Sequence, residues 1–99
     1  MCIGMALTGM RPISEIMFAD FMLVAMDQIV NQMNKVCYMS GGQKNVPMVI
    51  RTTIGAGRAA AAQHSQSLLA PIAHFPGAKI VYFLRCLYSK RIIKECDQR

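Results

Sequence analysis

The 99-residue chain has no tryptophan and only five acidic residues. This scarcity excludes sites built from paired carboxylates, because Glu15 lies within an expected strand while Glu95 and Asp97 lie close to the last residue. The sequence also offers no Ser-His-Asp order and no cluster of metal-ligating side chains. Self-contained hydrolytic catalysis and a metal site within this chain are therefore not expected.

Long apolar runs are missing as well. The longest, residues 16–26, is interrupted by Asp20 and is shorter than the roughly 20 residues of a membrane span. The first residues lack the basic and then apolar pattern of a signal peptide. The net charge is +6, but five of the eleven basic residues lie after residue 84, and no basic stripe is interleaved with aromatics. We therefore expect no binding to membranes or nucleic acids.

Paired cysteines are a third absence. The four cysteines, Cys2, Cys37, Cys86 and Cys96, include no CxxC pair and have no histidine at metal-ligand spacing. This pattern predicts free, buried thiols in a reducing compartment rather than disulfides or a zinc site.

What the chain does contain is typical of one small globular domain, with 54% apolar and 16% charged residues. The expected elements, in order, are a helix over 1–8, a strand over 11–17, a helix over 20–39, a strand over 46–53, a loop over 54–62, a helix over 65–74, a strand over 78–84 and a helix over 87–96. This alternation predicts an α/β fold with a parallel sheet covered by helices. Right-handed crossovers would place the loops after the strands along one edge.

The helix over 20–39 carries the clearest periodicity. Met22, Ile29 and Met33 recur at helical spacing, Asp20 is expected to cap the first turn, and Gly41-Gly42 to end the segment. Its methionine-rich face indicates core or subunit interface rather than a metal site.

Two other elements carry their own signals. The strand over 46–53 is continuous and apolar, as buried parallel strands are. For the helix over 65–74, Ser65 or Ser67 is the expected cap, and Pro71 fits only its first turn.

His64 is the first candidate for chemistry, because it follows a strand and a loop of small residues. A histidine side chain titrates near neutral pH and can act as general acid or base, but a loop histidine that caps a helix or faces water is an equally good interpretation. His74, before a turn, favours a structural role. Gly55-Ala56-Gly57 is half of a phosphate-binding loop at most, and a sharp backbone turn explains it equally well.

Phe18 and Phe21 flank Asp20 where the first strand passes into the long helix. If the strands are parallel, this junction lies on the same sheet edge as the loop with His64. An aromatic ring there could stack on a flat heterocycle, whereas ordinary core packing is the alternative for either ring.

Several segments occur together in the order of a known family. They are residues 9–16 (GMRPISEI), 18–21 (FADF), 27–32 (DQIVNQ), 38–42 (YMSGG), 46–52 (VPMVIRT), 55–57 (GAG), 63–67 (QHSQS) and 73–81 (AHFPGAKIV). Over roughly residues 3–82 the chain resembles the beta subunit of thiamine-diphosphate-dependent 2-oxoacid dehydrogenases of the pyruvate, acetoin and branched-chain type.

This resemblance implies a transketolase-like pyrimidine-binding domain, with thiamine diphosphate lying between an alpha and a beta subunit of a heterotetramer. The alpha subunit would hold the diphosphate and magnesium, and further partners would be a second beta subunit and the lipoyl acyltransferase core. Phe21 matches the aromatic residue that packs on the aminopyrimidine ring. His64 matches the active-site histidine that assists proton transfer and reductive acylation of the lipoyl group. The compartment would be the cytoplasm in a bacterium or the mitochondrial matrix in a eukaryote.

The chain also departs from the family pattern. The activating glutamate and first strand would belong to a segment before residue 1, and a further domain would follow, so we expect a partial domain over 1–82 and a divergent basic helix or tail over 83–99. Thr53-Ile54 replaces a usual Pro-Gly pair, and Leu69 and Pro71 replace a usual glutamate and aromatic. A reading-frame slip over 82–88 is one hypothesis for the divergence, which the nucleotide sequence would test.

The sequence therefore predicts a beta-subunit fragment of a pyruvate-type dehydrogenase, an enzyme of oxidative decarboxylation with acyl transfer to lipoamide. Because the activating glutamate is missing, the isolated chain is expected to be inactive. A non-catalytic interaction module or truncated gene product that binds a partner subunit is the alternative. Another thiamine-diphosphate enzyme, such as a transketolase, is disfavoured by residues 63–67 and 38–42.

Overall fold

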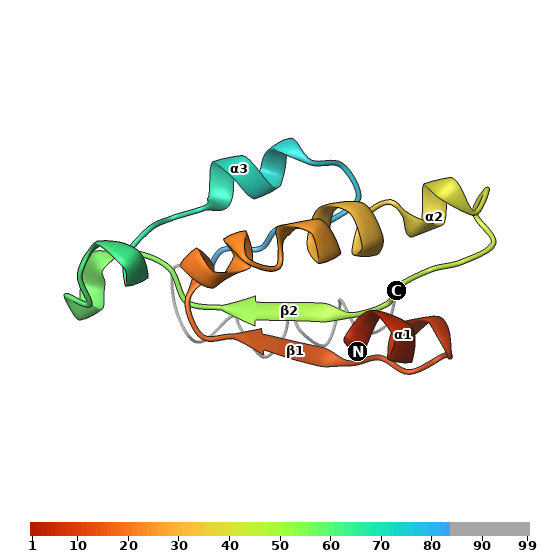
Figure 1. The fold of residues 1–99 in the computed structure, drawn as a ribbon, viewed down its shortest axis with the longest axis horizontal. Helices are drawn as coiled ribbons and strands as arrows, with labels where there is room; N and C mark the ends of the chain where they lie inside the picture. The colour runs from red at the N-terminus through yellow and green to blue at the C-terminus, as the bar shows by residue number, and fades with distance from the viewer. Residues whose placement is uncertain (84–99) are drawn as a thin grey trace.

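The computed structural model describes residues 1–83, and its centre is a pair of parallel strands, β1 (Ile13–Ile16) and β2 (Val49–Thr52) (Figure 1). A run of helical turns from residue 19 to residue 39 lies along one face of this pair, and α3 (Leu69–His74) lies beyond it. The predicted helix over 87–96 and the end of the expected third strand lie outside the described residues. The parallel α/β arrangement predicted from the sequence is confirmed.

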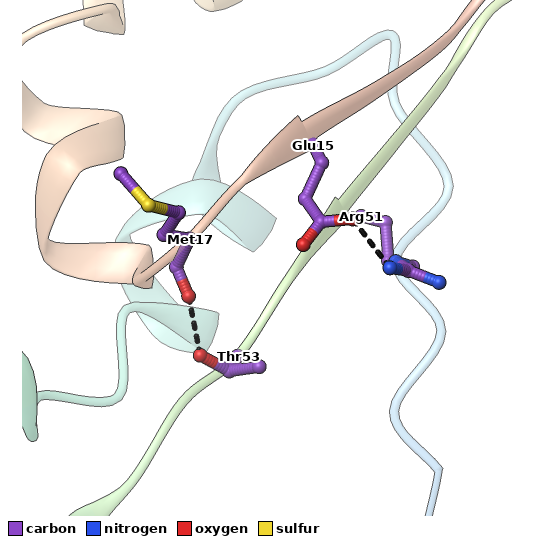
Figure 2. Close-up of polar contacts among 4 residues, drawn as sticks. All are labelled: Glu15, Met17, Arg51 and Thr53. Carbon is purple, nitrogen blue, oxygen red and sulfur yellow. Dashed lines mark hydrogen bonds and ion pairs between the residues drawn. The ribbon is translucent and has the colours of Figure 1, made fainter.

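The register of the two strands aligns Ile13 with Val49 and Ile16 with Thr52. Glu15 and Arg51 are opposite each other on the exposed side, where their side chains form an ion pair (Figure 2). The prediction of a buried second strand is wrong, since β2 is only half-buried. In the described part of the chain each strand has one hydrogen-bonded neighbour, so less of its surface is covered than in a wide sheet.

The core lies between the strands and the helical run. Ala19, Met22 and Ile29 form its buried centre, and Ile16, Ile50 and Ile72 pack against it from β1, β2 and α3, together with Ala25, Met33 and Ile54. The methionine-rich face therefore contributes to the core, as predicted. No helix in residues 1–83 is long and apolar enough to cross a membrane.

α1 (Cys2–Leu7) ends as the sequence predicts, at Gly9, which has φ +95° and whose N–H donates to Ala6 O at 3.1 Å. Cys2 and Cys37 are free thiols, as expected. Their predicted burial is wrong, because Cys2 is half-buried and Cys37 is exposed. Cys86 and Cys96 lie outside the described residues.

The predicted continuous helix over 20–39 is wrong in its geometry. The segment comprises a 3₁₀ turn, η1 (Ala19–Leu23), a π-helical stretch, η2 (Gln28–Met33), and a short α2 (Val36–Met39). In the wide turn of η2, the N–H of Asn34 donates to the carbonyl oxygen of Ile29, five residues earlier, at 3.0 Å. Both residues are buried, so the π geometry keeps them on the same covered side.

Asn34 is covered by the chain at Gly77. A Cβ atom at Gly77 would lie 2.4 Å from Asn34 O, and the φ of Gly77 is +110°. Glycine is therefore required at this position by both close approach and backbone conformation. This contact accounts for the burial of Asn34, a polar residue that helical periodicity alone would place in water.

The chain after residue 64 differs from the predicted structure at two places. α3 begins at Leu69 with Leu68 as N-cap and no side-chain cap, so the predicted caps Ser65 and Ser67 are wrong; Pro71 does lie in its first turn. The expected strand over 78–84 is not formed over 78–83, which are irregular and mostly exposed. Within residues 1–83 the main chain of this segment forms no ladder with β1 or β2, and residues without a ladder partner do not form a strand.

Candidate functional site

The candidate site lies at the carboxyl edge of the strand pair, where the chain after β1 meets the chain after β2. The Thr53 hydroxyl donates to Met17 O at 2.5 Å (Figure 2). The N–H of Ala19 donates to Thr53 O at 2.9 Å. These two hydrogen bonds join the segment after β1 to the segment after β2, beyond the ends of the strands. Thr53, one of the departures from the family pattern, therefore joins the two segments that carry the candidate residues.

The loop after β2 turns sharply before it reaches His64. Gly55 has φ +88°, and its N–H donates to Gln66 O at 3.3 Å, which closes the loop. Between them lie two single turns, η3 (Ala56–Arg58) and η4 (Ala62–His64). Ala59 at φ +50° and Ala61 at φ +61° have backbone conformations that favour glycine. The glycine-rich segment is thus a turn, as one of its two interpretations predicts.

Three rings meet where this loop ends. The His64 ring centroid lies 4.8 Å from that of Phe18 and 5.3 Å from that of Phe21, both edge-to-face, and the two phenyl rings are 5.8 Å apart. His64 and Phe18 are half-buried, whereas Phe21 remains 37% exposed. The structure therefore brings together the two residues singled out from the sequence, His64 and Phe21. His74 lies apart, against Phe75, at the end of α3.

Asp20 is the second polar group of this cluster. It is 7% exposed, and its Oδ1 accepts a hydrogen bond of 3.4 Å from Gln66 N–H, while Oδ2 is buried without a hydrogen-bond partner among the described residues. The prediction that Asp20 caps the long helix is wrong: the N-cap position is Phe18, and no side-chain cap is formed. The carboxylate instead contacts a loop 46 residues later in the sequence.

Beside Phe21 the surface is hollowed into an open, mainly apolar groove of about 460 Å³. Its lining residues come from the end of β1 and from the first helical turns, and they are Glu15, Ile16, Met17, Phe21, Val24 and Ala25. An apolar groove with one accessible aromatic ring fits a flat heterocycle that packs against that ring. Within residues 1–83 there is no group of three His, Cys, Asp or Glu side chains that could hold a metal ion.

A family model described as the pyrimidine-binding domain of transketolase matches residues 1–84. The chain belongs to this family. The pyrimidine-binding domain is a domain of thiamine-diphosphate enzymes, and its α/β fold agrees with the parallel strand pair and helices described above. The proposed division of the chain after residue 82 stays a prediction.

Curated relatives of this pyrimidine-binding domain are beta subunits. The acetoin:2,6-dichlorophenolindophenol oxidoreductase subunit beta of Cupriavidus necator is 57% identical over 79 residues, 80% of this chain and 23% of that protein. The pyruvate dehydrogenase E1 component subunit beta of Rhizobium meliloti is 45% identical over 92 residues, 93% of this chain and 20% of that protein. The mitochondrial human protein of the same name is 46% identical over 92 residues, 93% and 26% respectively. The chain thus spans between 20% and 26% of the length of these relatives.

Two residues of the pyrimidine-binding domain's candidate site were missed from the sequence. Asp20 was assigned to a helix cap, although its position between two phenylalanines at a strand end is a signal for a buried role. Thr53 was noted only as a departure from the family, and its hydroxyl bond depends on the parallel register, which places the ends of β1 and β2 together. The catalytic role of His64 and the cofactor contact of Phe21 stay predictions.

Proposed function

We propose that this chain is the pyrimidine-binding part of a beta subunit from a 2-oxoacid dehydrogenase of the pyruvate or acetoin type. The reaction of the whole enzyme would be oxidative decarboxylation of a 2-oxoacid, with transfer of the acyl group to lipoamide. One observation carries the proposal: the rings of Phe21 and His64, from segments more than forty residues apart, lie 5.3 Å apart, and Phe21 also lines an apolar groove. The names of the relatives support the same assignment.

In this proposal the exposed face of Phe21 packs against the aminopyrimidine ring of thiamine diphosphate. When bound, the cofactor supplies the carbon nucleophile that attacks the 2-oxo group. His64, held edge-on by Phe18 and Phe21, has ring nitrogens that can give or accept a proton at the reacting centre.

The rest of the site would come from partners. An alpha subunit would hold the diphosphate and the magnesium ion, a second beta subunit would complete the heterotetramer, and the lipoyl acyltransferase core would receive the acyl group. Val24 and Tyr38 are each 90% exposed and Met39 is 77% exposed, so the helical run offers apolar surface to neighbouring subunits. The compartment would be bacterial cytoplasm or mitochondrial matrix, which matches the sources of the relatives.

Calorimetric titration of thiamine diphosphate and magnesium into a mixture of this chain with the alpha subunit of the Cupriavidus necator oxidoreductase tests the proposal. We expect binding that neither protein shows alone. Phe21→Ala should weaken binding by roughly tenfold or more, since one aromatic contact with the ring is lost. Leu7→Ala on α1 is the matched control and should leave binding unchanged. Unchanged binding in Phe21→Ala would contradict the proposal.

The exposed apolar side chains of the helical run favour one alternative, a non-catalytic module that binds a partner subunit. The same mixture separates the two functions, because such a module would form a complex with the alpha subunit without binding the cofactor. In either case the chain by itself is expected to show no acyl transfer with thiamine diphosphate. Acyl transfer by the purified chain would refute that expectation.

A further inference from the structure

Asp20 occupies an unusual place in the candidate site. It lies between Phe18 and Phe21 in the sequence, it is buried, and its carboxylate does not serve the helix in which it lies. A buried carboxylate is costly unless hydrogen bonds compensate for its lost hydration. The bond that Oδ1 accepts is the one from Gln66 N–H, two residues after His64.

The main chain of Gln66 is held from both strand ends. Its N–H donates to Asp20 Oδ1 at 3.4 Å, from the segment after β1, and its C=O accepts from Gly55 N–H at 3.3 Å, from the loop after β2. Ser65 alone separates this anchored peptide from His64. The anchored main chain therefore restricts where the imidazole can lie, because only one residue separates Gln66 from His64.

We propose that Asp20 is a positioning residue, which holds the His64 ring against Phe18 and Phe21 by accepting the hydrogen bond from Gln66 N–H. Asp20 does not touch the reacting atoms in this account; it acts through the loop. Its importance for catalysis rests on the proposed function, but the positioning itself is a property of this chain and can be tested without cofactor.

The chain contains two histidines, which gives the test an internal reference. In proton NMR spectra of the 99-residue chain, the His64 ring signals should be displaced by the ring currents of Phe18 and Phe21, and those of His74 by Phe75. Asp20→Ala removes the acceptor, so the His64 signals should move to the positions of an unpacked histidine while those of His74 stay unchanged.

Asp20→Asn is the conservative variant, because its amide oxygen can still accept from Gln66 N–H. Asp20→Asn should therefore keep the His64 signals at their wild-type positions. If only the negative charge of Asp20 mattered, Asp20→Asn would move these signals as Asp20→Ala does. Asp27→Ala is the matched control: this exposed aspartate bonds to Gln28 and Asn31 within its own segment, and its loss should leave the His64 signals in place.

A second route removes the same bond from the other side. Replacing the amide N–H of Gln66 by an ester oxygen, through semisynthesis, keeps every side chain and should move the His64 signals as Asp20→Ala does. If Asp20→Ala does not fold, the ester variant decides alone. Shifted His64 signals that persist in the ester variant, or that are missing from the wild-type chain, would overturn the proposal.

The outcome is independent of the proposed function. If Asp20→Ala releases His64 but the mixture with an alpha subunit does not bind thiamine diphosphate, the positioning role stands and the proposed function fails. If the mixture binds the cofactor but His64 keeps its ring-current shifts in the Asp20→Ala and ester variants, the proposed function stands and the positioning role fails.

Discussion

The two ends of the parallel strand pair are built differently. At the carboxyl end, segments far apart in the sequence are bonded to each other, by the Thr53 hydroxyl to Met17 O and by Asp20 to Gln66 N–H. At the amino end, one hydrogen bond joins the two segments, from Val49 N–H to Pro12 O. The other bonds there are local, such as those from Gly9 N–H to Ala6 O and from Gly42 N–H to Cys37 O.

The conformations of the loops differ in the same way. The turns at the amino end place glycine at positive φ, with Gly9 at +95° and Gly41 at +62°. The loop at the carboxyl end has Gly55 at +88° but also places Ala59 and Ala61 at positive φ, which is less favourable for residues with a Cβ atom. The difference indicates that the carboxyl end holds a specific arrangement against some strain, whereas the amino end only connects elements. Candidate functional residues lie at the strained and cross-bonded end.

Removing a core side chain beneath the carboxyl end should have the largest effect. Met22 is 6% exposed in the centre of the core, so Met22→Ala should lower the free energy of unfolding by about 2–5 kcal/mol. Met10 at the amino end is 53% exposed, and Met10→Ala should change the free energy of unfolding by about 0.5 kcal/mol or less. Urea denaturation of both variants measures this, and equal losses would contradict the comparison.

Relief of strain in the loop should have the next largest effect, with the opposite sign. Ala61 has φ +61° and ψ −177°, a region that is essentially restricted to glycine, so Ala61→Gly should raise the free energy of unfolding by about 1 kcal/mol. Ala60→Gly is the control, since Ala60 has no positive φ and gains only chain flexibility. Thermal unfolding separates them; a lower melting temperature for Ala61→Gly would show that the loop is not strained.

Loss of the Thr53 hydroxyl tests the bond between the strand ends. Thr53→Val keeps the shape of the side chain and removes the bond to Met17 O, with an expected loss of about 1 kcal/mol. Hydrogen exchange at Ala19 N–H, the neighbouring link, should become faster. Thr8→Val at the amino end removes a local bond to Met5 O and should leave that exchange unchanged.

The Glu15–Arg51 ion pair should contribute least. Its side chains are 57% and 63% exposed, so water and salt screen the attraction. Glu15→Gln should lower the free energy of unfolding by at most about 0.5 kcal/mol in urea denaturation at low salt, and by less at high salt. A loss as large as that of Thr53→Val would show that the exposed face of the strands is held as tightly as their carboxyl end.

The parts of the fold that depend on local pattern were predictable. Apolar β-branched runs predict β1 and β2, Gly9 predicts the end of α1, and the rule for parallel crossovers predicts that Phe21 lies on the same sheet edge as His64. These features depend on residue type and spacing, which can be read from the sequence alone.

The parts that depend on distant contacts were not predictable. The π turn at Asn34 depends on the passage of Gly77 against it, and the use of Asp20 depends on an amide 46 residues later. The segment over 78–83 has strand-forming residues, but a strand needs a partner, and none pairs with it in the described part of the chain.

Parallel pairing of β1 and β2 brings His64 against the two phenylalanines. Nuclear Overhauser contacts in a sample with protonated His and Phe rings in a deuterated background test it most directly. We expect contacts from His64 to the rings of both Phe18 and Phe21, and none from His74 to either. A folded chain in which His64 contacts neither ring would contradict it.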